Sequence, residues 1–305
     1  MKRIRATFAA LIVAAACSPH ASAQNSADLT ASIVVGGVTR TYVYHVPPTL
    51  GKSVALVLSF HGHGGDGATQ AKLTNFDALS DARGFIVIYP DGIHRGWNDG
   101  REENAGADDI AFTKALIADF SKRFPIDPKR IYATGFSNGA TFTEVLGCKM
   151  SETFAAIAPV SGYIPQVDAP SCSPKRAPSI VIVGGTADPI MPYVGGEIHL
   201  FGKDRGLVLS AQQTISFWMV QAKCSQSPLI EDIVHDGSSD GTSVTHAVYQ
   251  RCAPGRGVEL YTVVDGGHTW PGGPQYAPRI IVGKASTQLD ASRVIVDFLL
   301  AHPLP

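Results

Sequence analysis

Short apolar runs alternate with helical patterns along most of the chain. Each run has four to seven residues and few polar positions, which is typical of strands that are buried on both faces of a parallel sheet. We expect such strands at Val54–Leu58, Phe85–Ile88, Arg130–Ala133, Ala156–Val160, Ser179–Val183 and Val258–Val264.

The segments between these runs show the 3.6-residue spacing of amphipathic helices. After Asp108-Asp109, apolar residues recur on one face as far as Phe120, and the two acidic residues suit the N-terminal end of a helix dipole. Further helices are expected after Gly139, over residues 211–222, and from a cap at Asp290 to near Pro303. The alternation of strand and helix predicts an α/β fold with a mostly parallel, doubly wound sheet.

The region before the first buried run has a different pattern. Leu29–Val35 is rich in β-formers, Gly36-Gly37 is a turn dipeptide, and Arg40–Val46 alternates again. This arrangement predicts an N-terminal antiparallel hairpin, which ends at Pro47-Pro48.

The first 23 residues have the features of a secretory signal peptide. Three basic residues precede the apolar stretch Ala6–Ala16, and Ala21-Ser22-Ala23 is a small-residue cleavage site. We therefore expect residues 24–305 to form a single mature domain that is secreted or periplasmic. The alternative is a lipoprotein anchored through Cys17. No later stretch is long and apolar enough to predict a membrane span.

Composition narrows the possible partners and the redox environment. The mature chain would carry 22 Lys and Arg against 26 Asp and Glu, a formal charge of −4, and it has no basic run that predicts nucleic-acid binding. Four cysteines in an exported chain predict two disulfides. Three pairings are possible, and we favour Cys148–Cys172 with Cys224–Cys252 because each pair brackets one short segment. No close CxxC spacing supports a zinc site instead.

The strongest chemical signal is Gly135-Phe136-Ser137-Asn138-Gly139. It follows an expected strand and precedes an expected helix, which is the context of a nucleophile elbow. In that turn the serine hydroxyl stands at the C-terminal edge of the sheet, where ligands bind in open α/β folds. We expect Ser137 to be a catalytic nucleophile.

A serine hydroxyl needs an imidazole to take its proton and a carboxylate to orient that imidazole. In this fold the acid precedes the histidine, and both follow the nucleophile. Asp188 and His268 lie on loops directly after the expected strands at 179–183 and 258–264, so we expect them to be the acid and the base. The carboxylates considered as alternatives, which lack this placement or lie too close to the histidine, are Asp168, Asp204 and Asp265.

A glycine-rich loop, His61–Gly67, follows the expected strand at 54–58. Ester hydrolysis passes through an oxyanion that two backbone N–H groups must stabilise. One donor is expected from Asn138, the residue after the nucleophile, and the other from this loop. We favour His63 for the second donor, with Gly64 next. His61 and His63 are also conceivable metal ligands, but no matching carboxylate cluster supports a metal.

These motifs together resemble the esterase/poly(3-hydroxybutyrate) depolymerase family, which also includes feruloyl and acetylxylan esterases. The resemblance covers residues 42–302. The residues that carry it are His61-Gly62-x-Gly64-Gly65, Gly96-Trp97-Asn98, Asp108-Asp109, Gly135-x-Ser137-Asn138-Gly139, Asp188, Pro192-Tyr193 and Gly266-Gly267-His268-Thr269-Trp270-Pro271-Gly272.

The resemblance implies the α/β-hydrolase fold, a Ser137–Asp188–His268 triad, no cofactor, and substrates that are esters of hydroxycinnamic, acetic or 3-hydroxyalkanoic acids. It also places Trp97 and Trp270 near the substrate cleft. The family's polymer-degrading members usually add a linker and a binding domain after the catalytic domain, and this chain ends at Pro305 with neither. We therefore expect a small or oligomeric ester as the substrate.

Two alternatives share the same sheet. A prolyl-oligopeptidase-type peptidase has the same triad but usually carries a large additional domain. An inactive binding protein of this fold would be expected to lose a triad residue or to block the oxyanion loop. Neither feature is evident in the sequence.

Overall fold

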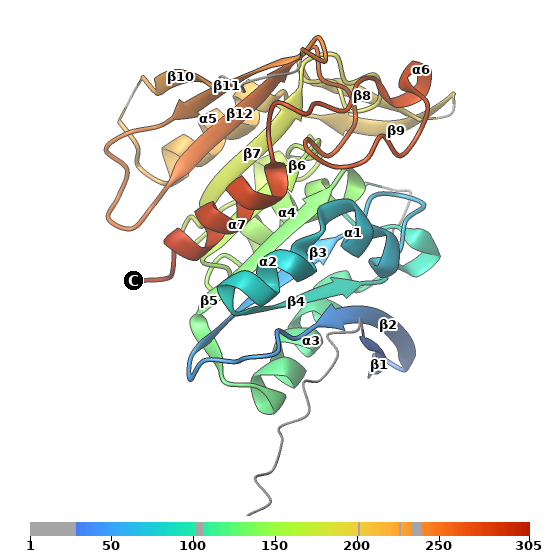
Figure 1. Ribbon diagram of the computed structural model, residues 1–305, viewed down its shortest axis with the longest axis vertical. Helices are drawn as coiled ribbons and strands as arrows, with labels where there is room; N and C mark the ends of the chain where they lie inside the picture. The colour runs from blue at the N-terminus through green and yellow to red at the C-terminus, as the bar shows by residue number, and fades with distance from the viewer. Residues whose placement is uncertain (1–28, 102–105, 201, 226, 234–238) are drawn as a thin grey trace, which may run out of the picture.

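A computed structural model describes residues 29–305 except 102–105, 201, 226 and 234–238 (Figure 1). The expected signal segment and Cys17 lie outside these residues. Within the described part, ten strands form one sheet in the order β1-β2-β4-β3-β5-β6-β7-β12-β11-β10, and a separate hairpin pairs β8 with β9.

The strands of the main sheet are short and mostly buried at its centre. Their bounds are β1 Leu29–Val35, β2 Val38–His45, β3 Val54–Phe60, β4 Phe85–Pro90, β5 Ile126–Phe136, β6 Ala156–Val160, β7 Ser179–Gly185, β10 Leu229–Ile233, β11 Ser243–Val248 and β12 Val258–Val264. The separate hairpin has β8 at Gly196–Leu200 and β9 at Lys203–Val208.

The centre of the sheet is parallel from β4 to β12, and both edges are antiparallel. At one edge β1 and β2 form the expected hairpin, with Val35 opposite Val38. At the other edge β10 and β11 extend the sheet from β12. The sequence pattern did not predict these two strands or the β8–β9 hairpin.

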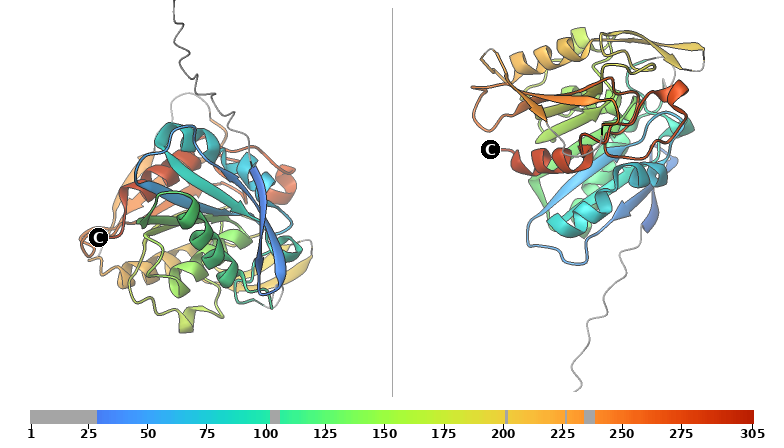
Figure 2. Two further views of the ribbon diagram at one scale, coloured as in Figure 1. Left: turned by 90° about the horizontal axis from the view of Figure 1, so that it is seen from below. Right: turned by 45° about the horizontal axis from the view of Figure 1, so that its top comes forward.

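Helices cover both faces of the sheet (Figures 1 and 2). One face carries α1 Gly67–Thr74, α2 Phe76–Arg83 and α7 Ala291–Ala301, and the other carries α3 Asp109–Arg123, α4 Asn138–Lys149 and α5 Ala211–Gln221. A short helix, α6 Arg279–Val282, and two 3-10 turns, η1 Ile93–Arg95 and η3 Ala169–Ser171, lie in the loops.

Two hydrophobic cores result, one on each face. Successive side chains of a strand point to opposite faces, so β3 contributes Leu56 and Leu58 to the core under α3, α4 and α5, and Ala55 and Val57 to the core under α1, α2 and α7. The continuous apolar runs of the sequence therefore reflect strands that are covered on both sides, as expected. The resulting frame holds the carboxyl ends of the parallel strands at one edge.

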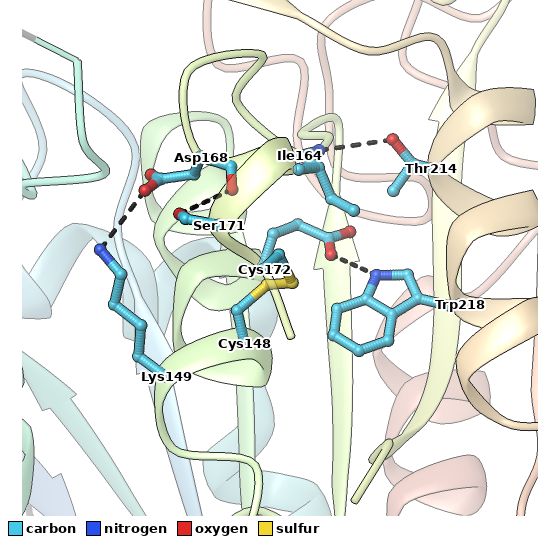
Figure 3. Close-up of a disulfide and its surroundings, with 9 residues drawn as sticks. Cys148, Lys149, Ile164, Asp168, Ser171, Cys172, Thr214 and Trp218 are labelled. Carbon is cyan, nitrogen blue, oxygen red and sulfur yellow. Dashed lines mark hydrogen bonds and ion pairs between the residues drawn. A yellow bond between two sulfur atoms is a disulfide. The ribbon is translucent and has the colours of Figure 1, made fainter. Parts of the chain in front are cut away.

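The two disulfides have the cysteine pairing that we favoured from the sequence. Cys148, at the end of α4, is bonded to Cys172 (Figure 3), and Cys224, after α5, is bonded to Cys252. Each bond closes a loop of fewer than thirty residues, with sequence separations of 24 and 28.

Candidate active site

Loops from four parallel strands meet at the carboxyl edge of the sheet. The glycine-rich loop follows β3, Ser137 follows β5, Asp188 follows β7 and His268 follows β12. Because parallel strands all point the same way, their following loops gather at the same edge. The fold therefore brings together residues that are far apart in the sequence.

Ser137 occupies a strained turn between β5 and α4. Its backbone has φ 56° and ψ −119°, a conformation that residues other than glycine rarely adopt. Its N–H donates to the carbonyl of Val160 at 3.0 Å. A Cβ atom at Gly135 would lie 2.3 Å from the carbonyl oxygen of Gly139, and one at Gly139 would lie 2.3 Å from that of Phe60. Both glycines are therefore required for strand and helix to approach this closely.

Ser137, His268 and Asp188 form a continuous hydrogen-bonded chain. His268 Nε2 lies 2.8 Å from Ser137 Oγ, and His268 Nδ1 lies 2.8 Å from Asp188 Oδ2. The other carboxylate oxygen of Asp188 accepts the N–H groups of Ile190 and Met191 at 2.9 and 2.8 Å. The side chains of His268 and Asp188 are only 3% and 1% exposed, so this pair is held away from bulk water.

The alternative carboxylates are engaged elsewhere. Asp204 pairs with His199 on the β8–β9 hairpin, and Asp168 pairs with Lys149 (Figure 3). Asp265 is exposed at the end of β12, and its N–H donates to the Thr186 hydroxyl. The carboxylate that accepts from His268 Nδ1 is Asp188.

The loop that carries His268 is fixed on both sides of this residue. The N–H of His268 donates to the carbonyl of Val282 at 2.6 Å, and its carbonyl accepts the Tyr276 hydroxyl at 3.0 Å. The ring of Phe136 packs against the imidazole with centroids 4.9 Å apart. Backbone and ring contacts together fix the position of the imidazole.

Asn138 has the placement expected of an oxyanion donor. It is the first residue of α4, and the N–H groups of a first helical turn have no acceptor within the helix. The positive end of the helix dipole also favours an anion there. The backbone N–H of Asn138 is therefore placed to donate a hydrogen bond to an oxyanion.

The loop after β3 narrows the choice for a second donor. The N–H of Gly64, the second choice of donor in the sequence analysis, donates to the carbonyl of Arg95 at 2.7 Å. It is therefore already engaged in a hydrogen bond within the protein. His63 lines the same cavity as Ser137. Burial, with smaller effects from the charges of Arg205 and Arg101, lowers the pKa of the His63 imidazole and favours its neutral form.

A cavity of about 450 Å³ opens beside Ser137 and His268. This volume is within the range of small-molecule binding sites, and much of the wall is apolar. Side chains that line it, in addition to the two catalytic candidates, are Leu73, Phe136, Ile190, Leu200, Tyr276 and Ile281.

The expectation that Trp97 and Trp270 line the cleft is wrong in this structure. Both side chains are fully buried. Trp97 donates its indole N–H to the carbonyl of His61 and stacks on Phe142, whereas Trp270 donates to the Ser292 hydroxyl. Each tryptophan fills a core position and satisfies its single donor inside the protein, so neither ring presents a face to a ligand.

Tyr276 is the aromatic residue on the cavity wall that the sequence did not single out. It is 46% exposed and lies eight residues after His268. The sequence holds no signal for this role, because no strand or helix pattern precedes Tyr276. Its contact with the cavity follows from the course of a long loop.

Metal binding finds no support in the geometry. Among the described residues, no group of three or more His, Cys, Asp or Glu side chains is arranged to hold a metal ion. The imidazole of His61 instead accepts the N–H of Gly92 at Nε2 and lies 2.8 Å from the carbonyl of Gly62 at Nδ1, so both ring nitrogens have structural partners.

No described helix is long and apolar enough to span a membrane.

Comparisons with known proteins show that the chain is similar to esterases. A family profile described as esterase PHB depolymerase matches residues 40–192. A Nocardia uniformis subsp. tsuyamanensis protein named as an esterase, NocK, is 30% identical, with 88% of this chain and 81% of that protein aligned. Poly(3-hydroxyalkanoate) depolymerase C of Paucimonas lemoignei is 24% identical over 75% of this chain and 58% of its own length.

Two further similarities concern a longer relative and a solved structure. Feruloyl esterase B of Piromyces equi is 29% identical over 71% of this chain, which spans only 40% of that protein. The acetyl xylan esterase structure from Aspergillus awamori covers 79% of this chain and 94% of its own, with a TM-score of 0.57 and 17% identity, and shows the α/β-hydrolase fold. The chain is a serine esterase of this fold and belongs to the esterase PHB depolymerase family.

Proposed function

We propose that Ser137, His268 and Asp188 catalyse ester hydrolysis by two-step acyl transfer. The observation that carries this proposal is the hydrogen-bonded chain from Ser137 Oγ through the imidazole to Asp188. In the first step His268 Nε2 takes the serine proton while Ser137 Oγ attacks the ester carbonyl. The imidazolium then returns the proton to the alcohol, which leaves.

The second step repeats the first with water as the nucleophile. His268 takes a proton from water, the hydroxide attacks the acyl-enzyme carbonyl, and the proton returns to Ser137 Oγ as the acid leaves. Asp188 accepts the Nδ1–H of the imidazole throughout. Its second oxygen accepts two backbone N–H groups, which fix the orientation of the carboxylate.

Each tetrahedral intermediate places a negative charge on the former carbonyl oxygen. We assign the backbone N–H groups of Asn138 and His63 to bind it. Support comes from the position of Asn138 at the start of α4 and from the place of His63 on the wall of the same cavity. Removing one such donor costs about 3–4 kcal/mol of transition-state stabilisation in measured cases.

The cavity suggests the class of ester. A space of about 450 Å³ with leucine, isoleucine, phenylalanine and tyrosine side chains suits a compact apolar or aromatic acyl group. Relatives are named for feruloyl, acetylxylan and poly(3-hydroxyalkanoate) esters. We propose that the substrate is a small or oligomeric hydroxycinnamoyl, acetyl or 3-hydroxyalkanoate ester.

We further propose that residues 24–305 act as one exported domain after removal of residues 1–23. The two disulfides support an oxidising destination, where such bonds persist. Their assignment to a secreted or periplasmic enzyme is tested by N-terminal sequencing of the protein recovered from culture medium and periplasm. A mature N-terminus near Gln24 is the expected result.

The central test replaces the nucleophile. Ser137→Ala should lower kcat for p-nitrophenyl acetate by roughly 10⁶-fold, as in other serine hydrolases, while circular dichroism stays unchanged. The exposed Ser171→Ala is the matched control and should keep wild-type activity. Substantial turnover by the Ser137 variant would overturn the assignment.

A substrate panel addresses the ester class and the alternatives. Methyl ferulate, acetylated xylan and 3-hydroxybutyrate oligomers are compared with a peptide p-nitroanilide. Turnover of at least one ester and no peptide cleavage is expected. Preferential peptide cleavage would favour the peptidase alternative, and failure of a fluorophosphonate to label Ser137 would favour an inactive binding protein.

A further inference from the structure

The carboxamide of Asn138 makes two hydrogen bonds with the backbone of Trp97. Asn138 Oδ1 accepts the N–H of Trp97 at 2.7 Å, and Asn138 Nδ2 donates to its carbonyl at 3.1 Å. Asn138 is 5% exposed, so these bonds are made away from water. The side chain of the proposed oxyanion donor is therefore tied to a loop that follows β4.

Asp99 on that loop provides a third hydrogen bond. Its Oδ2 accepts from Asn138 Nδ2 at 2.8 Å, and the hydroxyl of Thr141, one turn further along α4, lies 2.5 Å from the same oxygen. Asp99 is 2% exposed. A buried carboxylate is costly unless its charge is compensated and its oxygens are hydrogen-bonded.

Arg101 supplies the compensating charge. Its guanidinium contacts both oxygens of Asp99, with Nε at 3.0 Å from Oδ1 and 3.1 Å from Oδ2, and its side chain is 9% exposed. The guanidinium also donates to the carbonyl of Arg205 on β9 at 2.7 Å. The carboxylate thus lies between the Arg101 guanidinium and the start of α4.

The same loop also holds the opposite wall of the oxyanion site. The indole N–H of Trp97 donates to the carbonyl of His61 at 2.9 Å, and the carbonyl of Arg95 accepts the N–H of Gly64. His61 and Gly64 flank the loop position of His63. One loop between β4 and α3 therefore contacts the segments that carry both proposed oxyanion donors.

We propose that Asp99 is a positioning residue for the oxyanion hole, which it sets by holding the Asn138 carboxamide against Trp97, with Arg101 as its counter-ion. The proposal rests on the proposed role of the Asn138 N–H. Asp99 itself contacts the first turn of α4 and is not among the residues lining the cavity, so it acts through Asn138. Without the Asp99 carboxylate, one N–H of the Asn138 carboxamide loses its acceptor and the Arg101 guanidinium loses its counter-ion. The backbone N–H of Asn138 then moves from its productive position.

The test compares Asp99→Ala and Asp99→Asn with wild type. For Asp99→Ala, kcat/KM for p-nitrophenyl acetate should fall about 10–100-fold, mainly through kcat, because displaced groups weaken transition-state binding. The Ki of a trifluoromethyl ketone, which forms an oxyanion on Ser137, should rise by a similar factor. Asp99→Asn keeps the shape and an acceptor oxygen, so its loss should be smaller.

Two measurements separate positioning from general damage to the fold. Rates are expressed per Ser137 labelled to completion with a fluorophosphonate, so unfolded protein does not count. Ile295→Ala, in the core under α7, is the control, because it should lower the Tm without changing the rate per labelled site.

A double-mutant cycle tests the route through Asn138. Asn138→Ala keeps the backbone N–H but removes the carboxamide, so Asp99→Ala should add little to it. Wild-type rates and Ki values per labelled site in both Asp99 variants, or losses that add fully in the double variant, would overturn the proposal. Either result leaves the assignment of Ser137, tested by Ser137→Ala, unaffected.

Discussion

His268 Nε2 lies 2.8 Å from the hydroxyl oxygen of Ser137, although the two residues are 131 positions apart in the sequence. The strands that precede them, β5 and β12, are linked by three parallel pairings, β5–β6, β6–β7 and β7–β12. Because parallel strands all point the same way, both residues lie at the same edge of the sheet. The base also contacts Asp188, which follows the strand next to β12. The order of strands in the sheet therefore assembles the three side chains.

Replacing Asp188 with asparagine tests its proposed role. The amide keeps the shape of the carboxylate but no longer stabilises the imidazolium, and it favours the wrong imidazole tautomer. We expect kcat for p-nitrophenyl acetate to fall by about 10⁴-fold, as in other serine triads, with a smaller effect on KM.

Asp204→Asn is the matched control for this change. Asp204 is exposed, pairs with His199 and was an alternative acid in the sequence. Its replacement should leave kcat within about twofold of wild type, as expected for a surface substitution that does not contact the reacting groups. Similar losses in both variants would contradict the assignment of Asp188.

Much of this site was predictable because its signals are local. Positions 135 and 139 must be glycine for steric reasons, and Asp188 and His268 lie on loops after strands that are mostly buried. Strands covered on both faces leave a continuous apolar pattern, and the loops after them can be located from sequence alone. The parallel core was predictable for the same reason, whereas the N-terminal hairpin was predictable from the Gly36-Gly37 turn between two β-rich segments.

The remaining features depend on tertiary contacts that leave no local pattern. Strand β10 is almost fully exposed, and β8 and β9 form a separate two-stranded sheet, so none of the three shows an apolar run. The burial of Trp97 and Trp270 is decided by neighbours such as Phe142 and Phe76, which are distant in the sequence. The role of the Asp99–Arg101 ion pair could not be predicted from the sequence, because it depends on the contact of Asp99 with α4 in the folded protein.

The contrast between Tyr276 and Trp270 predicts which aromatic residue sets specificity. Tyr276 lines the cavity and donates to the carbonyl of His268, whereas Trp270 is buried. Tyr276→Ala should raise KM for methyl ferulate several-fold more than KM for p-nitrophenyl acetate, because an aromatic acyl group loses an aromatic contact worth about 0.5–1.5 kcal/mol. The measurement is steady-state kinetics with both esters.

Trp270→Phe is the comparison variant for this experiment. It removes the indole donor to Ser292 and part of a filled core, so it should lower the Tm. The ratio of the two KM values should stay that of wild type. A change of this ratio in Trp270→Phe, with none in Tyr276→Ala, would show that the buried ring controls acyl selection.

Glu144 should make the stability of the fold depend on pH. This residue of α4 is fully buried, and its Oε2 accepts the indole N–H of Trp218 at 2.6 Å. Its Oε1 has no hydrogen-bond partner among the described residues. Burial raises the pKa of this carboxyl from 4.5 to about 8, and the bond from Trp218 offsets only part of that rise.

The raised pKa fixes the sign of the pH effect. Between about pH 4.5 and pH 8 the folded protein keeps a proton on Glu144 that the unfolded chain has released. The free energy of unfolding should therefore decrease as pH rises through this window, by up to about 1.4 kcal/mol per pH unit, and level off above it. Glu144→Gln carries no titrating proton, so urea unfolding from pH 5 to pH 9 should show a flatter profile. The exposed Glu152→Gln should follow wild type, and parallel profiles for wild type and Glu144→Gln would show that the buried carboxyl does not hold its proton.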